Sequence, residues 1–241
     1  MADVLGVNGS PRKYGNTYKS LRIALMAAEY EDLETELINL VDLDIKPCLG
    51  CLCDEQKACK YPCVIDDDMR ELYDKILEAK GVIIATPIYW FSPSGLTKNF
   101  LDRLTALENM IFVEGKSWLE GKIGGVIAIG NDGGGLNVVS TIVSALNCMG
   151  FLIPPFAITY FEEQRNVMDS LEFLTELANI GRNLALVIKK ETKKRWFDQS
   201  LKEWIKEVRE KIEQEARRIR EQEKERMKIV TKLIKKKQLV R

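Results

Sequence analysis

Apolar and polar positions alternate along the chain in short blocks of two kinds. Three blocks are nearly continuous apolar runs, Val4–Asn8, Gly81–Thr86 and Ile123–Ile129. Such runs are typical of strands that are covered on both faces of a parallel sheet. Glu34–Leu40 alternates polar and apolar residues and predicts a strand near an edge, and Phe151–Thr159 predicts a final edge strand because it contains two prolines.

Apolar residues recur at helical spacing after each of these strands. The expected helices lie around residues 21–28, 69–77, 96–107, 138–149 and 169–188. Strand and helix therefore alternate, which predicts an α/β fold with a doubly wound, five-stranded parallel sheet in the flavodoxin-like strand order. We place this domain at residues 1–190, with a cysteine-rich loop at residues 47–64.

The composition changes after Lys190. Apolar residues recur there every three or four positions in a background of lysine, arginine and glutamate, up to Lys237. This pattern predicts a long amphipathic helix with a break in the polar run 220–226. We interpret residues 191–241 as a helical extension whose apolar stripe covers its own domain or a partner subunit.

Three loops with glycine or proline follow strands one, three and four of the predicted sheet, after Asn8, Thr86 and Ile129. The first offers hydroxyl and amide groups beside the free N–H groups of a helix start, which favours phosphate. The second carries three adjacent aromatic residues that suit a flat heteroaromatic ligand, and the third is rich in glycine. Each loop alone has an ordinary explanation, as a turn, a packing contact or an interface. Together they fall at the strand-order switch point, where α/β proteins bind ligands.

Five of the six cysteines lie within sixteen residues, at Cys48, Cys51, Cys53, Cys59 and Cys63. Closely spaced thiolates suit an iron–sulfur cluster or a zinc ion. Disulfides are disfavoured because nothing marks the chain for secretion. The sixth cysteine, Cys148, is expected in the core, and Asp66–Asp68 are expected only to cap the next helix.

Overall composition excludes several classes of function. The 36 basic and 36 acidic residues cancel, which removes any general electrostatic case for binding nucleic acid or an anionic membrane. No apolar run is long enough to span a bilayer, and the first residues do not form a signal peptide, so we expect a cytoplasmic protein. The absence of histidine excludes imidazole catalysis and histidine–metal sites.

A set of motifs resembles one known family. In chain order they are Gly9–Thr17, Val64–Met69, Thr86–Tyr89, Ser94–Gly95, and Lys98 with Asp102 and Arg103. Over roughly residues 1–190 this set resembles the NADPH-dependent FMN reductase superfamily. The cysteine loop placed directly before Val64 resembles the iron–sulfur flavoprotein branch of that superfamily.

The resemblance implies an oxidoreductase in which FMN carries the chemistry, with no catalytic side chain. The phosphate of FMN would be held by Ser10, Arg12, Asn16 and Thr17. Its ring would be bracketed by two loops, Pro87, Ile88, Tyr89, Trp90 and Phe91 on one side, and Asn131, Asp132, Gly133, Gly134 and Gly135 on the other. The resemblance also implies a [4Fe–4S] cluster near an FMN across a subunit contact, in a homodimer or homotetramer. Electrons would pass from a donor such as reduced ferredoxin through the cluster to FMN, and then to oxygen, peroxide, a quinone or a small organic molecule.

The cysteine spacing departs from the family pattern, which has two residues between each of the first three cysteines. Here only one residue separates Cys51 from Cys53. Cys48, Cys51 and Cys63 map onto the pattern, and the fourth ligand is either Cys53 or Cys59. Two other functions stay open: an NAD(P)H-dependent FMN or quinone reductase whose cysteines hold zinc or nothing, and a non-catalytic flavodoxin-like scaffold.

Overall fold

The computed structural model describes residues 1–191 and 193–238. Thr192 and the last three residues of the predicted extension lie outside the described residues. The strands are β1 (Val4–Asn8), β2 (Thr35–Asn39), β3 (Gly81–Tyr89), β4 (Ser92–Pro93), β5 (Ile123–Gly130) and β6 (Ile158–Glu162). The helices are α1 (Asn16–Tyr30), α2 (Met69–Glu78), α3 (Gly95–Arg103), α4 (Thr105–Glu108), α5 (Met110–Glu114), α6 (Gly135–Cys148), α7 (Leu171–Ile188), α8 (Leu201–Gln222) and α9 (Lys224–Gln238).

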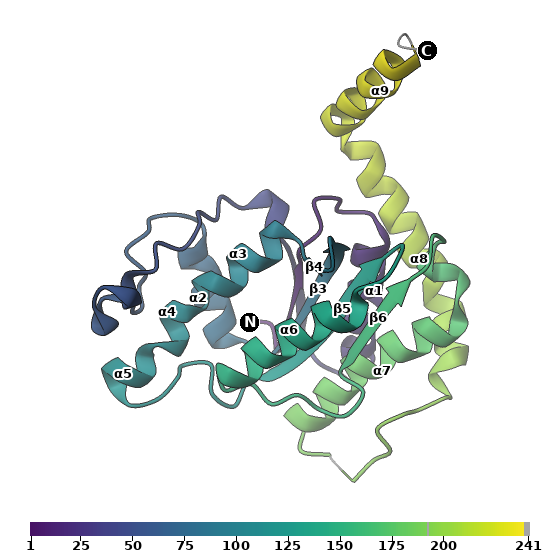
Figure 1. The fold of residues 1–241 in the computed structure, drawn as a ribbon. Helices are drawn as coiled ribbons and strands as arrows, with labels where there is room; N and C mark the ends of the chain where they lie inside the picture. The colour runs from purple at the N-terminus through teal and green to yellow at the C-terminus, as the bar shows by residue number, and fades with distance from the viewer. Residues whose placement is uncertain (192, 239–241) are drawn as a thin grey trace.

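Five parallel strands form the sheet in the order β2-β1-β3-β5-β6, and the short β4 pairs antiparallel with the end of β3 (Figure 1). This spatial order is that of the doubly wound, flavodoxin-like sheet that the alternation of strands and helices predicted. β1, β3 and β5 are central and almost wholly buried, as their continuous apolar runs indicated. The carboxyl ends of these three strands therefore meet at one edge of the sheet.

Helices cover both faces of the sheet (Figure 1). One core layer joins the sheet to α1, α7 and α8, and the other joins it to α2, α3, α4 and α6. Gly181 of α7 lies so close to α1 that a β-carbon there would stand 1.7 Å from the carbonyl oxygen of Ala24. A glycine is therefore required where these two helices cross.

Two strand predictions were wrong in their bounds. β3 continues through Pro87 to Tyr89, beyond the predicted end at Thr86, because it turns back into β4. The last strand is Ile158–Glu162 rather than 151–159, and before it only Leu152 makes a bridge, to Ile123. Two adjacent prolines and Phe156, which has a positive φ of 54°, delay the start of regular pairing.

Two other predictions on this side of the molecule also need correction. The single helix expected at 96–107 is divided into α3 and α4, and α5 follows. Cys148, expected in the core, is exposed at the end of α6. The helix turns that residue outward, while Val138, Val139, Ile142 and Leu146 are buried.

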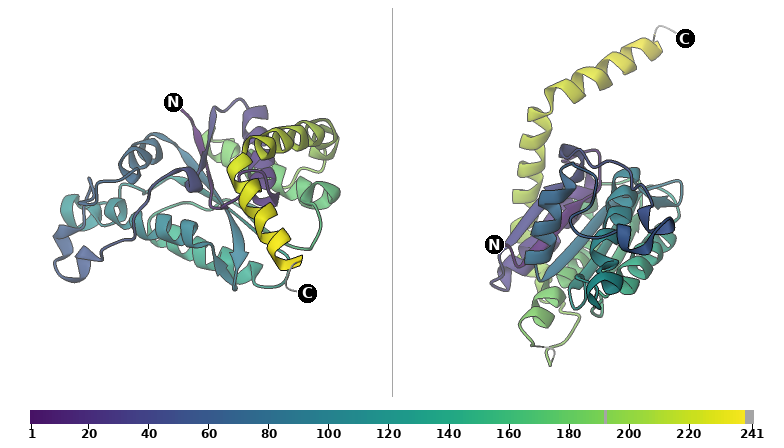
Figure 2. Two further views of the ribbon diagram at one scale, coloured as in Figure 1. Left: turned by 90° about the horizontal axis from the view of Figure 1, so that it is seen from above. Right: turned by 90° about the vertical axis from the view of Figure 1, so that its left-hand side faces the viewer.

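The C-terminal extension forms two helices, and they separate at Glu223, inside the polar run where a break was predicted. α8 buries Leu201, Ile205, Ile212 and Ala216 against the domain. α9 extends beyond the sheet and its helices (Figure 1 and the right-hand view of Figure 2). Within residues 1–191 and 193–238, no helix combines the length and the apolar character needed to cross a membrane.

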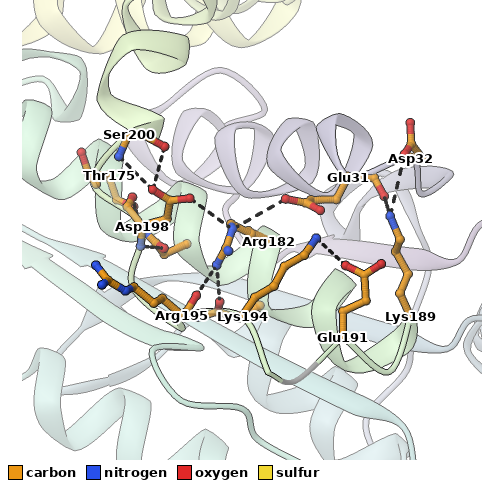
Figure 3. Close-up of polar contacts among 12 residues, drawn as sticks. Glu31, Asp32, Thr175, Arg182, Lys189, Glu191, Lys194, Arg195, Asp198 and Ser200 are labelled. Atoms are coloured by element: carbon orange, nitrogen blue, oxygen red, sulfur yellow. Dashed lines mark hydrogen bonds and ion pairs between the residues drawn. The ribbon is translucent and has the colours of Figure 1, made fainter.

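A polar network fixes the connection between α7 and α8 (Figure 3). Arg182, itself 6% exposed, donates to the carbonyl oxygen of Arg195 at 2.7 Å and lies 3.6 Å from Glu31 and 3.7 Å from Asp198. Lys189 reaches Asp32 at 3.7 Å. Because Arg182 joins α1, α7 and the connection, the start of α8 is held against the domain.

Candidate functional site

A cavity of about 510 Å³ opens at the carboxyl edge of the sheet. Its volume lies in the range of small-molecule and cofactor sites. The residues that line it are Arg12, Asn16, Thr17, Pro87, Ile88, Tyr89, Trp90, Phe91, Ile129, Gly130, Asn131, Asp132 and Gly133. The three loops that the sequence singled out therefore share one cavity. Ile129 and Gly130 were not predicted, and the predicted residues Ser10, Gly134 and Gly135 do not line it.

The first turn of α1 forms one end of the cavity. The helix begins after Gly15 with no capping side chain and no acidic residue in its first turn, so its N–H groups stay available for an anion. The guanidinium of Arg12 lies over Gly15, 3.5 Å from where a β-carbon on that residue would stand. A positive side chain thus adds to the positive end of the helix dipole.

Ser10 shapes this loop rather than lining the cavity. It is 3% exposed, and its hydroxyl accepts the N–H of Arg12 at 3.1 Å. Its own N–H donates to the side chain of Asn8 at 3.1 Å. Ser10 therefore stabilises the turn that leads from β1 towards Arg12.

Buried hydroxyl groups join the first loop to the second. Ser94 donates to the carbonyl oxygen of Gly9 at 2.6 Å, and Thr97 donates to Thr86 at 2.9 Å. Ser94 also caps α3 by accepting the N–H of Thr97. These three hydroxyl residues were not predicted as part of the site, although the motif segments contained two of them.

An aromatic hairpin forms the second side of the cavity. Trp90 and Phe91 connect β3 to β4, and both have a positive φ, of 51° and 61°. Non-glycine residues adopt this conformation at a cost and concentrate at functional sites. Trp90 is 93% exposed, whereas Phe91 reaches the glycine loop, where a β-carbon on Gly134 would stand 2.8 Å from its ring. Gly134 is thus required for packing against the hairpin.

The third loop ends in a second helix start, but this one already has an acidic partner. Gly135 is the first residue of α6, and its N–H donates to the carboxylate of Glu162 at 2.5 Å. This carboxylate disfavours a second anion at the start of α6. Of the two helix starts beside the cavity, α1 is therefore the one suited to phosphate.

The cysteine loop is anchored by a buried ion pair. Asp67 and Arg103 have fully buried side chains and contact each other at 2.5 and 3.0 Å. Arg103 donates to the carbonyl oxygen of Lys46 at 2.9 Å, and Asp67 accepts the N–H of Lys46 at 2.9 Å. The interpretation of Asp66–Asp68 as only a helix cap was therefore wrong, because Asp67 ties the start of the loop to α3.

Asn109 fixes the far side of the same loop. It is 2% exposed, and its amide donates to the carbonyl oxygens of Gln56 and Cys59, each at 2.7 Å. The side chains of Cys59 and Cys63 pack against the core, whereas Cys48 and Cys53 are exposed. No sequence signal marked Asn109, because its role depends on a contact with residues fifty positions away.

The cysteine sulfurs influence one another. Burial, together with the neighbouring sulfurs of Cys48, Cys63 and Cys51, raises the pKa of the Cys59 thiol to about 11. These residues supply the soft thiolates that iron–sulfur clusters and zinc prefer. In the described part of the chain, however, no three acidic or cysteine side chains are already gathered as a metal site. The cysteine side chains are thus of the right type for a cluster, but in this structure the described cysteine sulfurs are not gathered around one metal position.

Comparison with known proteins identifies the family. Residues 2–166 match the family described as NADPH-dependent FMN reductase. The chain belongs to this family. The resemblance read from the motifs is confirmed, and at the level of the family so is the prediction of a flavin-dependent oxidoreductase.

Two relatives are named iron–sulfur flavoprotein. One, from Methanocaldococcus jannaschii, is 38% identical over 128 residues, which are 53% of this chain and 61% of the relative. The other, from Methanosarcina thermophila, is 31% identical over 153 residues, or 62% of this chain and 75% of the relative. The matched region thus spans less than two thirds of the first relative.

A solved structure of RosB with a bound 8-demethyl-8-formylriboflavin-5'-phosphate intermediate shares the fold, with a TM-score of 0.67. It is 21% identical, and the match covers 88% of each chain. An archaeal flavodoxin also matches, with a TM-score of 0.51 and 14% identity over 77% of this chain and 98% of that one. These likenesses confirm the predicted flavodoxin-like fold.

Proposed function

We propose that the cavity binds FMN, with the phosphate at the start of α1. The observation that carries this proposal is the convergence of three separate loops on one cavity whose phosphate end has free N–H groups and Arg12. Asn16 and Thr17 lie in the first turn of α1 and line the cavity, so they are placed to contact the phosphate or ribityl chain. Ser10 supports the loop from behind through its bond to the N–H of Arg12.

The ring of FMN would lie between the aromatic hairpin and the loop 130–133. Tyr89, Trp90 and Phe91 offer apolar surface for a flat ring. Gly133 and its neighbours allow backbone groups to approach the ring edge. Gly134 and Gly135 would act indirectly, one by packing on Phe91 and the other by starting α6.

We further propose that the cysteine loop holds a [4Fe–4S] cluster through Cys48, Cys51, Cys59 and Cys63. The names of the two relatives support the cluster. Asn109 and the core packing of Cys59 favour it over the exposed Cys53 as the fourth ligand. The raised pKa of the Cys59 thiol means that this residue would release a proton when it binds iron.

On this basis the protein transfers electrons from a donor such as reduced ferredoxin, through the cluster, to FMN and on to an acceptor. The acceptor classes are oxygen, peroxide, a quinone or a small organic molecule. When bound, FMN exchanges one or two electrons and so couples a one-electron donor to a two-electron acceptor. The chain supplies position and electrostatics: Arg12 and α1 hold the phosphate, and the hairpin shields the ring.

Anaerobic purification tests the proposal. The wild-type protein should contain FMN, about four iron atoms and labile sulfide per chain, with a broad absorbance shoulder that dithionite bleaches. Cys59→Ser should lose most of its iron, whereas Cys53→Ser, the matched control, should keep it. Zinc without sulfide would refute the cluster, and iron loss in Cys53→Ser alone would refute the ligand assignment.

The family description favours a second candidate, an NAD(P)H-dependent FMN or quinone reductase without a cluster. The two functions differ in the electron donor. Rapid reduction of the bound flavin by NADPH, with no need for ferredoxin, would favour the second. Reduction by ferredoxin that is lost in Cys59→Ser would favour the first.

A further inference from the structure

The junction between α8 and α9 lies against the loop that precedes α1. We define the junction as residues 220–227 and the phosphate loop as residues 10–15. Glu223, the residue at which the two helices separate, forms an ion pair with Lys13 at 2.8 Å. Arg226 donates from Nη1 to the carbonyl oxygen of Pro11 at 3.2 Å. The C-terminal extension thus contacts both the main chain and a side chain of the loop.

Two further contacts involve Tyr14. The guanidinium of Arg220 lies 6.0 Å from the centre of the Tyr14 ring, and the hydroxyl of Tyr14 lies 3.8 Å from the sulfur of Met227. Residues on both sides of the break in the helix therefore enclose this side chain. The loop has no regular secondary structure of its own, and its internal support comes from the bond between Ser10 and Arg12.

The C-terminal extension also contacts the first turns of α1, which follow the phosphate loop in the chain. Glu213 of α8 forms an ion pair with Lys19 at 2.8 Å, and Glu215 accepts the hydroxyl of Tyr18 at 2.8 Å. These contacts fix α8 against the start of α1, and so they also fix the position of the junction relative to the phosphate loop. Contacts that fix a loop before its ligand arrives reduce the ordering cost of binding.

Lys13 and Arg12 are adjacent in the chain, but Lys13 forms ion pairs and Arg12 lines the cavity. Lys13 is shared by Glu223 and Asp42, at 2.8 and 2.9 Å, so its charge is already balanced. Arg12 lines the cavity and lies over the start of α1. Lys13 is therefore held by its ion pairs, whereas Arg12 lines the cavity and is placed to meet a phosphate.

We propose that the α8–α9 junction is a positioning element for the phosphate loop, and that Glu223 and Arg226 thereby raise the affinity of this chain for flavins that carry a phosphate. This inference rests on the proposed function, since it takes the loop to be the phosphate site of FMN. It assigns to the C-terminal extension a role in ligand binding. The residues of the junction do not line the cavity, so they act through the loop and not by touching the ring.

Binding of FMN and riboflavin, measured by quenching of flavin fluorescence on the full-length protein, tests this role. Riboflavin has the same ring and no phosphate. The double variant Glu223→Ala/Arg226→Ala should bind FMN about tenfold more weakly and riboflavin within about twofold of wild type. Lys228→Ala is the matched control, because Lys228 is exposed and its ion pair among residues 1–191 and 193–238 is with Glu225 of the same helix, at 2.5 Å. It should bind both flavins as wild type does.

Arg226→Lys should recover part of the lost FMN affinity, because it keeps a donor for the carbonyl oxygen of Pro11. Thermal unfolding of each variant shows whether the domain is intact. Equal weakening of both flavins, or unchanged FMN binding in the double variant, would overturn the inference while the proposed function stands. A wild-type protein that binds neither flavin would refute the proposed function, and the inference with it.

Discussion

Gly9 lies where the first loop of the cavity contacts β3 and the residue that precedes α3. Its N–H donates to the carbonyl oxygen of Ala85 at 2.8 Å, and its own carbonyl oxygen accepts the hydroxyl of Ser94. A β-carbon on Gly9 would stand 1.8 Å from the hydroxyl of Thr97. That hydroxyl is already engaged with Thr86, so it has little freedom to move aside.

Gly9→Ala should therefore lower the free energy of unfolding by about 1–3 kcal/mol, because it overpacks a buried polar network. Gly95→Ala is the control, since no atom lies within 4 Å of the β-carbon it would add. That variant should change the free energy by less than about 1 kcal/mol. Urea unfolding of both variants gives the comparison. Equal stability of the two would show that the Thr97 contact relaxes without cost.

The ion pair of Asp67 and Arg103 is the second decisive feature at the residue scale. Burial alone would raise the pKa of Asp67, but hydrogen bonds from Arg103 and from the N–H of Lys46 outweigh it, so the pKa lies below its ordinary value of 3.8. A carboxyl group of this kind stabilises the fold above its unfolded pKa. That contribution is lost as the pH falls through the lower folded pKa.

Asp67→Asn should lower the free energy of unfolding at pH 7 by about 3–5 kcal/mol, because it leaves Arg103 buried without its counter-charge. Between pH 4 and pH 2, its stability should fall less steeply with acid than that of wild type. Asp66→Asn is the control, because the side chain of Asp66 is exposed and forms a surface pair with Arg70 at 3.4 Å. Urea titrations across this pH range would contradict the argument if Asp67→Asn and wild type declined in parallel.

Residue types were easier to predict than residue partners. The candidates Arg12, Asn16 and Thr17 were found because they follow a strand and open a helix, which is local information. The partners Asp67 with Arg103, and Asn109 with Cys59, are 36 and 50 positions apart. No periodicity links such pairs, so the sequence showed the cysteines without showing what holds their loop.

At the scale of elements, prediction worked where hydrophobic pattern and burial agree. β1 and β5 match their predicted bounds closely, because both are covered on two faces and read as continuous apolar runs. The hairpin of β3 and β4 was missed because β3 extends through Pro87 beyond its buried part. The last strand was misplaced because its exposed and buried residues alternate after a pair of prolines.

The apolar stripe of the C-terminal extension is buried on α8 and exposed on α9. Ile212 on α8 is fully buried against α1 and α7, while Ile229 on α9 is 61% exposed. Ile212→Ala should lower the free energy of unfolding by about 2–5 kcal/mol. Ile229→Ala should change it by less than about 0.5 kcal/mol. Similar losses from both substitutions, measured by thermal or urea unfolding, would mean that α9 is covered in solution.

On the scale of the whole molecule, the two proposed cofactor sites lie apart within one chain. The cavity contains no residue of the cysteine loop, and the loop lies beside α5, away from β4 (Figure 1). A ligand in the cavity would therefore not touch the cysteine loop of the same chain. We accordingly keep the proposal that the cluster of one subunit serves the flavin of another, in a homodimer or homotetramer.

Cys63→Ser should abolish the cluster and leave the FMN dissociation constant within about twofold of wild type, because the two sites share no residue. Cys148→Ser, which alters an exposed cysteine outside the loop, should keep both cofactors.

In wild type, flavin reduction through the cluster should slow per chain when the protein is diluted enough to dissociate, because each chain then lacks the partner's site. Sedimentation and stopped-flow measurements at the same concentrations test this coupling. A rate per chain that stays constant in the monomer would place the electron path within a single subunit, and the loop would then have to close towards the cavity.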